Sequence, residues 1–380
     1  MPSHFLNAPE PLPRGARLYT LRYSTQDKGQ PVEATGMVAL PWDSEQHDTG
    51  PWPLIVFLHG TTGVGNQCAP TSIGLEYRML VYLLASQGYV VVAPDFIGLD
   101  AAGEWGTRPE GTHAYMGVEQ TAIGSWDMVR AARTLVQGEL EEPVDLTGEV
   151  VVWGVSQGGN GALATDLLAP YYAPEMDVRA VVAMVPAPDL YGMAQRAMQG
   201  LVWTSKALSA MFAALHIWYE NESGSPWSTI FNDRAPHDYA GVTADQIFAE
   251  CDVGDLFDGA TSIEQALNPD FRSALLDGDD PGFEPYSCYL RDNSITTTPF
   301  TRQSETPTLF VMGELDETVI TEVQRAAFLQ LCGQGHRLEY LECADADHED
   351  GAVWSLPEQV AWVAERLAGV PIDADRLCQV

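Results

Sequence analysis

The stretch VVVWGVSQGGNGAL, residues 150–163, joins an apolar run to a glycine-rich segment. Residues 154–158 fit the pattern Gly-x-Ser-x-Gly, with a β-rich run before the serine and helical periodicity after it. Such a turn holds its serine in a strained backbone, and Gly154 and Gly158 would let strand and helix approach closely. The pattern alone is common, but this context predicts that Ser156 is a nucleophile rather than a turn residue.

Strand and helix signals alternate along most of the chain, which is typical of a mostly parallel sheet covered by helices on both faces. The expected strands are residues 18–24, 33–41, 53–60, 89–95, 149–155, 179–186, 308–314 and 337–343. The expected helices are residues 73–87, 119–137, 157–168, 321–332 and 357–368. Because the first two strands precede any helix, we expect them to pair antiparallel at one edge.

The alternation stops between about residues 188 and 300, a segment too long for a plain loop. We predict a mainly helical cap over 188–300, inserted after the sixth strand, and an α/β core formed by residues 1–187 and 301–380. Open α/β proteins bind ligands at the carboxyl ends of their strands, so the cap is expected there. The alternative is a small separate domain remote from the site.

A nucleophilic serine needs a histidine to take its proton and an acid to orient that histidine. After the seventh strand, TLFVMGELDETV (308–319) offers Asp316 as the acid, with Glu314 and Glu317 as rivals. After the last strand comes His348, whereas the other histidines lie too early in the chain or are N-terminal. The predicted triad is therefore Ser156, Asp316 and His348.

The carbonyl oxygen of a substrate gains negative charge during attack and needs hydrogen-bond donors already in place. The backbone amide of Gln157, directly after the serine, is one expected donor. The second is expected from the loop after the third strand, FLHGTTGVG (57–65), as the amide of Thr61 or of Thr62.

Acidic residues surround His348, but their spacing does not match an EF-hand calcium loop, so we expect a solvated loop. They are Asp345, Asp347, Glu349 and Asp350. The six cysteines contain no Cys-x-x-Cys pair, which argues against a zinc or redox site. We expect neither a metal nor an organic cofactor.

The charge balance is strongly acidic, with 53 Asp and Glu against 19 Lys and Arg and a net charge of −34. Nucleic acids and anionic membranes would repel such a chain, so neither is an expected partner. No apolar run approaches the roughly 18 residues of a membrane span, so stable membrane insertion is not expected. A halophilic or marine host is a hypothesis that this acidity suggests, because salt screens self-repulsion.

These features resemble the α/β-hydrolase superfamily and, more closely, the secretory lipase family of Candida lipase A-like serine carboxylesterases and lipases. The shared stretches are RYSTQDKGQPVEATGMVALP (22–41), HGTTGVGNQCAP (59–70), GYVVVAPDFIGLD (88–100), GVSQGG (154–159) and VPAPDL (185–190). The resemblance implies an α/β-hydrolase fold, a helical cap and an ester hydrolase that uses the predicted triad.

The resemblance also implies two disulfides, Cys68–Cys251 and Cys332–Cys378. Cys288 and Cys343 would then be a third pair or buried thiols. Disulfides imply an oxidising compartment, which suggests a secreted or periplasmic protein. The first residues, MPSHFLNAPEPLPRG, show no signal-peptide pattern, so a cytoplasmic location stays open.

The leading hypothesis is a serine carboxylic-ester hydrolase that forms an acyl-enzyme on short-to-medium acyl esters, small-molecule substrates. Aromatic residues of the cap are candidates for an apolar pocket. They are Trp203, Phe212, Trp218 and Trp227, with Tyr219 and Phe231 beside them. The alternatives are a lipase on longer-chain triglycerides, a triad amidase, peptidase or acyltransferase, and a silent hydrolase fold used for binding. A monomer or a small homo-oligomer is expected.

Overall fold

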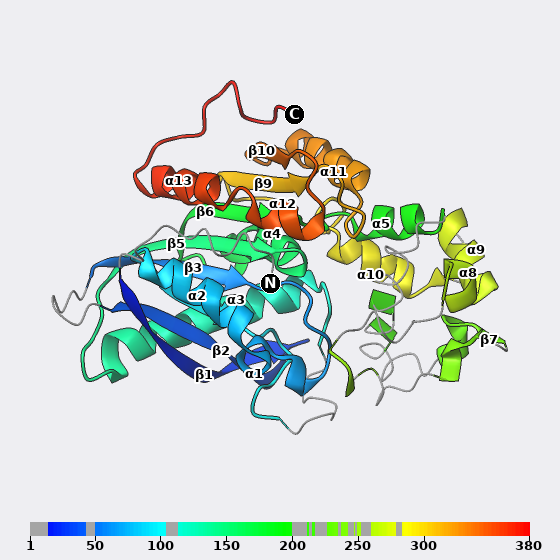
Figure 1. Cartoon of the computed structure of the whole chain (residues 1–380), viewed down its shortest axis with the longest axis horizontal. Helices are drawn as coiled ribbons and strands as arrows, with labels where there is room; N and C mark the ends of the chain where they lie inside the picture. The colour runs from blue at the N-terminus through cyan, green and yellow to red at the C-terminus, as the bar shows by residue number, and fades with distance from the viewer. Residues whose placement is uncertain are drawn as a thin grey trace.

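The structure is a computed structural model of the chain, and it describes most of the predicted core and part of the predicted cap. The described residues are 14–42, 50–103, 113–199, 211–212, 215–216, 226–234, 237–241, 247, 249–251, 260–278 and 283–380. Figure 1 shows a central sheet with helices on both of its faces.

Eight strands form the central sheet, in the order β1-β2-β4-β3-β5-β6-β9-β10. Their bounds are β1 Gly15–Asp27, β2 Gln30–Trp42, β3 Trp52–Leu58, β4 Val90–Pro94, β5 Leu146–Val155, β6 Asp177–Met184, β9 Thr308–Gly313 and β10 Leu338–Cys343. β1 pairs antiparallel with β2, and β2 pairs antiparallel with β4. The other neighbours pair in parallel. The eight predicted strands and the antiparallel edge pair are therefore confirmed.

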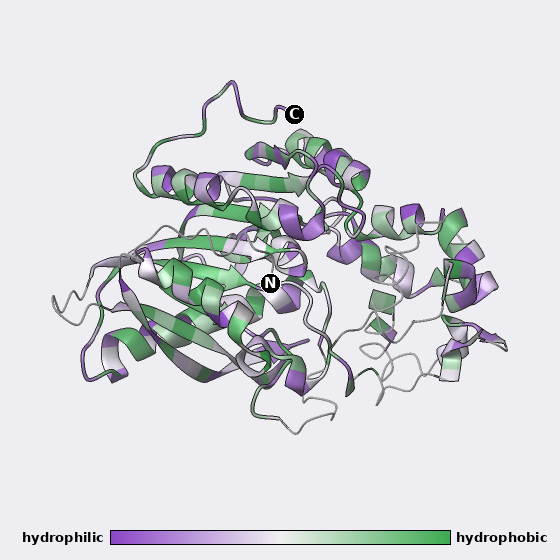
Figure 2. Ribbon diagram, in the orientation of Figure 1, coloured by the Kyte–Doolittle hydropathy of each residue, from purple (hydrophilic) through white to green (hydrophobic). Residues whose placement is uncertain are grey.

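Alternate residues of the central strands are buried on opposite faces of the sheet. Val150 and Val152 of β5 belong to one apolar cluster with residues of helix α3 (Val118–Thr134). Val151 and Trp153 belong to another cluster, with residues of helices α2 (Leu75–Ser86) and α13 (Leu356–Leu367). Because both faces are covered, the strands are almost uniformly apolar. Figure 2 shows this as largely green strands under helices of mixed colour.

The helices that cover the sheet follow the predicted periodicity. The longer ones are α2 Leu75–Ser86, α3 Val118–Thr134, α4 Gln157–Tyr172, α11 Thr321–Gly333 and α13 Leu356–Leu367. The short ones are η2 Asn66–Cys68, α1 Pro70–Ile73, the π-helical turn η3 Leu135–Glu139 and α12 His348–Val353. Each of the five predicted helices corresponds to one of the longer ones.

Short elements make up the described part of the segment 188–300. They are α5 Leu190–Ala197, η4 Trp227–Thr229, β7 Asp233–Arg234, β8 His237–Asp238, η5 Tyr239–Gly241, α8 Ile263–Ala266, α9 Pro269–Asp277 and α10 Tyr286–Asn293. In Figure 1, α5, α8, α9 and α10 lie on the side toward which the arrowheads of β3 and β9 point. Their buried side chains form one cluster with Val64, Met116 and Val319 of the core loops. The division into core and cap stays a prediction.

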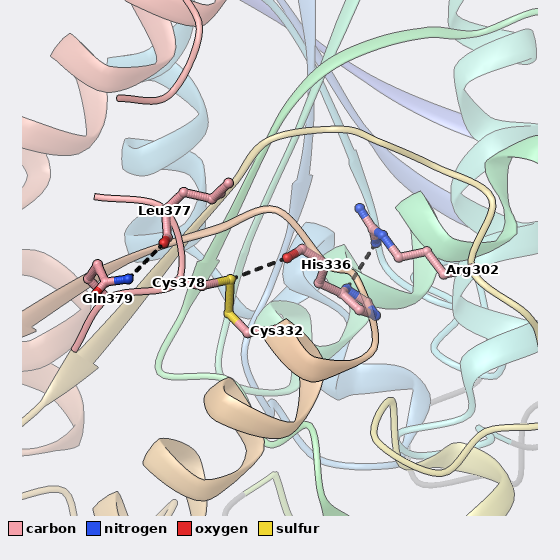
Figure 3. The surroundings of a disulfide bond; sticks show 6 residues. All are labelled: Arg302, Cys332, His336, Leu377, Cys378 and Gln379. Atoms are coloured by element: carbon pink, nitrogen blue, oxygen red, sulfur yellow. Dashed lines mark hydrogen bonds between the residues drawn. A yellow bond between two sulfur atoms is a disulfide. The ribbon is translucent and has the colours of Figure 1, made fainter. Parts of the chain in front are cut away.

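Two disulfides join distant parts of the chain, with the pairings that the resemblance implies. Cys68 is bonded to Cys251 over a sequence separation of 183, and Cys332 to Cys378 over a separation of 46. Figure 3 shows the second bond where the C-terminal segment meets the end of α11, beside His336 and Arg302. Cys288 and Cys343 are free, and Cys288 is exposed rather than buried.

The structure also bears on metals and membranes. Within the described ranges, no group of three or more Asp, Glu, His and Cys side chains is arranged to hold a metal ion. None of the helices in those ranges combines the length and the apolar character that a bilayer crossing requires.

Candidate active site

The turn between β5 and α4 holds Ser156 in a backbone conformation that side chains rarely adopt, with φ 57° and ψ −114°. A Cβ atom at Gly154 would collide with the carbonyl oxygen of Gly158, and one at Gly158 with that of Leu58. Glycine is therefore required at both positions for strand and helix to approach. The Ser156 amide donates to the Met184 carbonyl at 2.8 Å, which ties the turn to β6.

His348 lies between Ser156 and Asp316. Its Nε2 is 2.9 Å from Ser156 Oγ, and its Nδ1 is 2.7 Å from Asp316 Oδ2. The three residues follow the carboxyl ends of β5, β9 and β10. These strands are far apart along the chain, but in the sheet β9 and β10 are neighbours and only β6 lies between β5 and β9. The structure thus brings the predicted residues into one hydrogen-bonded path.

Asp316 is 3% exposed, and the structure surrounds its carboxylate with donors. Oδ1 accepts the backbone amides of Thr318 at 2.9 Å and Val319 at 2.8 Å, and Oδ2 accepts Gln324 Nε2 at 3.0 Å as well as His348. These hydrogen bonds satisfy the buried carboxylate and fix its orientation beside His348.

The rival carboxylates stand apart from this path. Glu314 is exposed, and it accepts the backbone amide of Asp345 at 2.9 Å. Glu317 is exposed too. Neither side chain shares the burial that Asp316 has beside His348.

Of the acidic residues around His348, Asp345 and Asp347 lie in an exposed loop as expected, whereas Glu349 and Asp350 lie in the first turn of a helix. His348 is the first residue of helix α12, and Asp347 caps this helix by accepting the amides of Glu349 and Asp350, both at 3.0 Å. Carboxylates are favoured at a helix N-terminus, because they satisfy free amides and complement the dipole. Asp347, Glu349 and Asp350 therefore stabilise the start of the helix that carries the histidine.

The loop after β3 passes beside Ser156. A Cβ atom built on Gly60 would lie 3.6 Å from Ser156 Cβ. Gly60, Thr61 and Gln157 border the cavity above the serine. Thr62 is buried and does not border that cavity, so of the two predicted threonines Thr61 is the one beside the reaction centre.

The cavity above Ser156 has a volume of about 370 Å³, within the usual range for small-molecule sites. The described lining is largely apolar and comes from core loops, from helices α2, α4, α5 and α12, and from Met211. Its members are Gly60, Thr61, Tyr77, Tyr115, Met116, Val155, Ser156, Gln157, Ala187, Leu190, Met193, Met211, Thr318, Val319, His348, Glu349 and Ala352.

The predicted aromatic pocket residues that the structure describes lie away from the cavity. Phe212 is fully buried and packs edge-on against Phe271, with ring centroids 5.1 Å apart. The ring of Trp227 packs against those of His216 and Phe231, with centroid distances of 4.4 Å and 5.7 Å. Neither Phe212 nor Trp227 borders the cavity. Trp203, Trp218 and Tyr219 fall outside the described residues.

Two further residues, His113 and Tyr115, contact the predicted donors. His113 Nε2 is 3.1 Å from Gln157 Nε2, and the Tyr115 hydroxyl is hydrogen-bonded to Thr61 Oγ1. Burial lowers the pKa of His113 to about 4, and burial raises the pKa of Tyr115. Both side chains are therefore neutral at pH 7. The sequence gives no motif that marks them, because their position after β4 carries no pattern.

His59 supports the loop after β3 from below. Its Nδ1 is 2.6 Å from the Gly60 carbonyl oxygen, and its ring packs on Phe96 with centroids 4.2 Å apart. Burial lowers the pKa of His59 to about 4, so the ring is neutral and can donate one hydrogen bond to that carbonyl.

Comparison with known families matches the part of the chain that contains the elbow. Residues 64–220 match the model of the secretory lipase family, somewhat less than half of the chain. This part of the chain is therefore similar to secretory lipases. A comparison with curated proteins finds no match.

Solved structures of α/β hydrolases are similar to the chain in fold. The rice cell wall degrading esterase LipA from Xanthomonas oryzae is 23% identical, with a TM-score of 0.71 over 97% of this chain and 94% of that one. A putative hydrolase from Legionella pneumophila is 22% identical, with a TM-score of 0.73 over 94% and 91%. Candida antarctica lipase A is 16% identical, with a TM-score of 0.66 over 95% and 80%.

Proposed function

We propose that the chain is a serine carboxylic-ester hydrolase that works through an acyl-enzyme. The observation that carries this proposal is the hydrogen-bonded path from Asp316 through His348 to Ser156, which ends at a largely apolar cavity. A nucleophile, a base and an orienting acid at these distances are what acyl transfer requires.

In the first half of the reaction, His348 Nε2 takes the proton of Ser156 as its Oγ attacks the ester carbon. Asp316 accepts from Nδ1–H and so keeps Nε2 unprotonated and aimed at the serine. The imidazolium then gives its proton to the departing alcohol. In the second half, His348 activates water, which releases the acid from Ser156.

The oxygen of the tetrahedral intermediate would be met by the backbone amides of Gln157 and Thr61. Gln157 begins helix α4, so its amide is free of an intrahelical partner and the helix dipole favours negative charge there. Thr61 borders the same cavity from the loop after β3. Removing one such donor typically costs about 3 to 4 kcal/mol of transition-state stabilisation.

The cavity supports short-to-medium acyl esters as substrates. Its volume of about 370 Å³ equals that of about a dozen water molecules in the liquid, which suits a small ester better than a triglyceride. Leu190, Met193 and Met211 form an apolar wall, which supports a cap role for the segment 188–300. Longer triglycerides would need this wall to move.

A secreted or periplasmic location is part of the proposal. Two disulfides and the match to a secretory family support it, because disulfides persist in oxidising compartments.

The test is a series of p-nitrophenyl esters from acetate to palmitate, with triolein and an aminopeptide nitroanilide added. We expect the largest kcat/KM for acyl chains of medium length or shorter, and a loss of at least about 10³-fold in Ser156→Ala. A loss of only a few-fold in that variant would refute the nucleophile. If kcat/KM is largest for the palmitate ester or for triolein, the protein is a lipase rather than an esterase. If it cleaves the anilide faster than the esters, it is an amidase.

A further inference from the structure

We propose that His113 and Tyr115 are positioning residues that hold the two oxyanion donors in place, an inference that rests on the proposed ester hydrolysis. Both belong to the short segment 113–116 between β4 and α3. One side chain contacts Gln157 and the other contacts Thr61. A single segment therefore reaches both halves of the oxyanion site, which come from different loops.

The hydrogen bonds of His113 fix its tautomer. Nδ1 lies 3.0 Å from the Ile97 carbonyl oxygen, which can only accept, so Nδ1 carries the hydrogen. The ring is neutral, since burial lowers its pKa to about 4. Nε2 therefore accepts, and the group 3.1 Å away is the amide nitrogen of Gln157, a donor.

This arrangement allows one orientation of the Gln157 side chain. If the amide were flipped, its oxygen would face the lone pair of His113 Nε2, and both groups would repel each other. Gln157 is 4% exposed and borders the cavity. His113 thus keeps the side chain next to Ser156 out of the space that the acyl group would occupy, and it fixes the residue whose amide is to stabilise the oxyanion.

Tyr115 holds Thr61, the residue whose amide is the second proposed oxyanion donor. Residues 59–63 form neither helix nor strand, so side-chain contacts must hold this part of the loop. The Tyr115 hydroxyl bonds to Thr61 Oγ1, and Tyr115 itself is held by the Tyr289 hydroxyl, which donates to its carbonyl oxygen. Tyr289 lies in α10, so the loop is tied to the described part of the insertion.

A pure packing role would rest on the rings alone. The ring of His113 stacks on Phe96 with centroids 6.2 Å apart, and it meets Tyr115 edge-on at 5.9 Å. Substitution by phenylalanine keeps an aromatic ring at either position but removes the polar contacts. His113→Phe and Tyr115→Phe therefore separate the two roles.

The experiment measures kcat, KM and the affinity for an alkyl boronic acid, which forms a charged tetrahedral adduct with an active serine. We expect kcat to fall about tenfold in each variant, as for the loss of one hydrogen bond, with KM within about twofold. Boronate affinity should fall by the same factor as kcat. In the Thr61→Val background, Tyr115→Phe should have no further effect, because the bond is already gone.

Two additional variants keep the result interpretable. Tyr172→Phe removes a partly buried tyrosine hydroxyl bond, to Asp127 at 2.9 Å, and should leave kcat unchanged because Tyr172 lies away from the cavity. If His113→Phe does not fold, as judged by circular dichroism, Gln157→Met removes the same contact while keeping the backbone amide. It should then show the tenfold loss.

The inference is wrong if the folded His113 or Gln157 variant and Tyr115→Phe keep kcat and boronate affinity within twofold of wild type while Ser156→Ala abolishes turnover. It is also wrong if KM rises with kcat unchanged, since that indicates pocket shape rather than donor positioning. Full activity of Ser156→Ala is a different outcome, because it overturns the proposed function itself.

Discussion

Asp316→Asn changes one atom of the proposed triad, and the structure specifies how the protein must respond. The asparagine nitrogen can replace Oδ1 or Oδ2. In place of Oδ1 it would face the backbone amides of Thr318 and Val319, two donors that cannot turn away. In place of Oδ2 it would face Gln324 Nε2 and His348 Nδ1, and both of these side chains can rearrange.

The second orientation therefore costs less. Gln324 Nε2 loses this acceptor but still donates to the Val319 carbonyl oxygen at 2.6 Å, so one of its two hydrogen bonds is kept. His348 must then accept through Nδ1 and carry its hydrogen on Nε2, which lies 2.9 Å from Ser156 Oγ. A protonated Nε2 cannot take the serine proton. We expect kcat to fall about 10⁴-fold, as for the same change in other Ser-His-Asp enzymes.

The assay is kcat/KM for p-nitrophenyl butyrate at pH 7 to 9, with Glu314→Gln and Glu317→Gln as matched controls. Both controls lose one carboxylate from the same turn and should stay within threefold of wild type. Thermal denaturation checks that Asp316→Asn is folded. A loss below about tenfold in Asp316→Asn, or an equal loss in either control, would refute the assignment of the acid.

Three further predictions concern stability. Replacing Cys68 and Cys251 by alanine opens a loop with a sequence separation of 183, so the free energy of unfolding should fall by up to about 5 kcal/mol in thermal denaturation. The loss should be smaller for the Cys332–Cys378 pair, with its separation of 46, and equal losses would contradict this. Because burial depresses the pKa of His113 to about 4, its neutral form stabilises the fold above pH 6.5, and this stability is lost as pH falls toward 4. Between pH 7 and pH 5, urea titrations should therefore show that the wild type loses about 1 to 2 kcal/mol more of its free energy of unfolding than His113→Phe does. If the two free energies fall in parallel with pH, His113 does not have this effect. With a net charge of −34, the chain should gain stability and activity in added salt, whereas an optimum near zero salt with inactivation in molar salt would refute this.

The fold was predictable because its signals are local. A central strand such as β5 is a short run of valines buried on both faces, and its length, its β-branched residues and the glycines beside it distinguish it from a buried helix. The ends were less predictable: β5 begins at Leu146, three residues before the expected start. Residues at strand ends are half-exposed and lack the apolar signal, so the pattern cannot reveal that they still pair.

The order of residues along the chain was enough to find Ser156, Asp316 and His348 as candidates, because each follows a strand whose carboxyl end meets the others. His113 was set aside for the same reason, since it precedes the acid. Its contact with Gln157 depends on how the segment after β4 crosses the start of α4, which is a matter of tertiary packing. The order of residues along the chain identifies candidates for the triad, but it does not identify residues that act through tertiary contacts.

The wall of the cavity gives the same lesson in a different form. Aromatic content suggested Phe212 and Trp227 as pocket residues. Buried aromatic rings also fill the interior of a protein, and here Phe212 packs on Phe271 inside the segment 188–300. Leu190 and Met193 border the cavity instead, at the start of α5, a few residues after β6 ends at Met184. They are three apart, so they share one helical face. Leu190 and Met193 reach the cavity because they follow a strand end closely, so for this part of the lining the chain distance from β6 is a better guide than aromatic character.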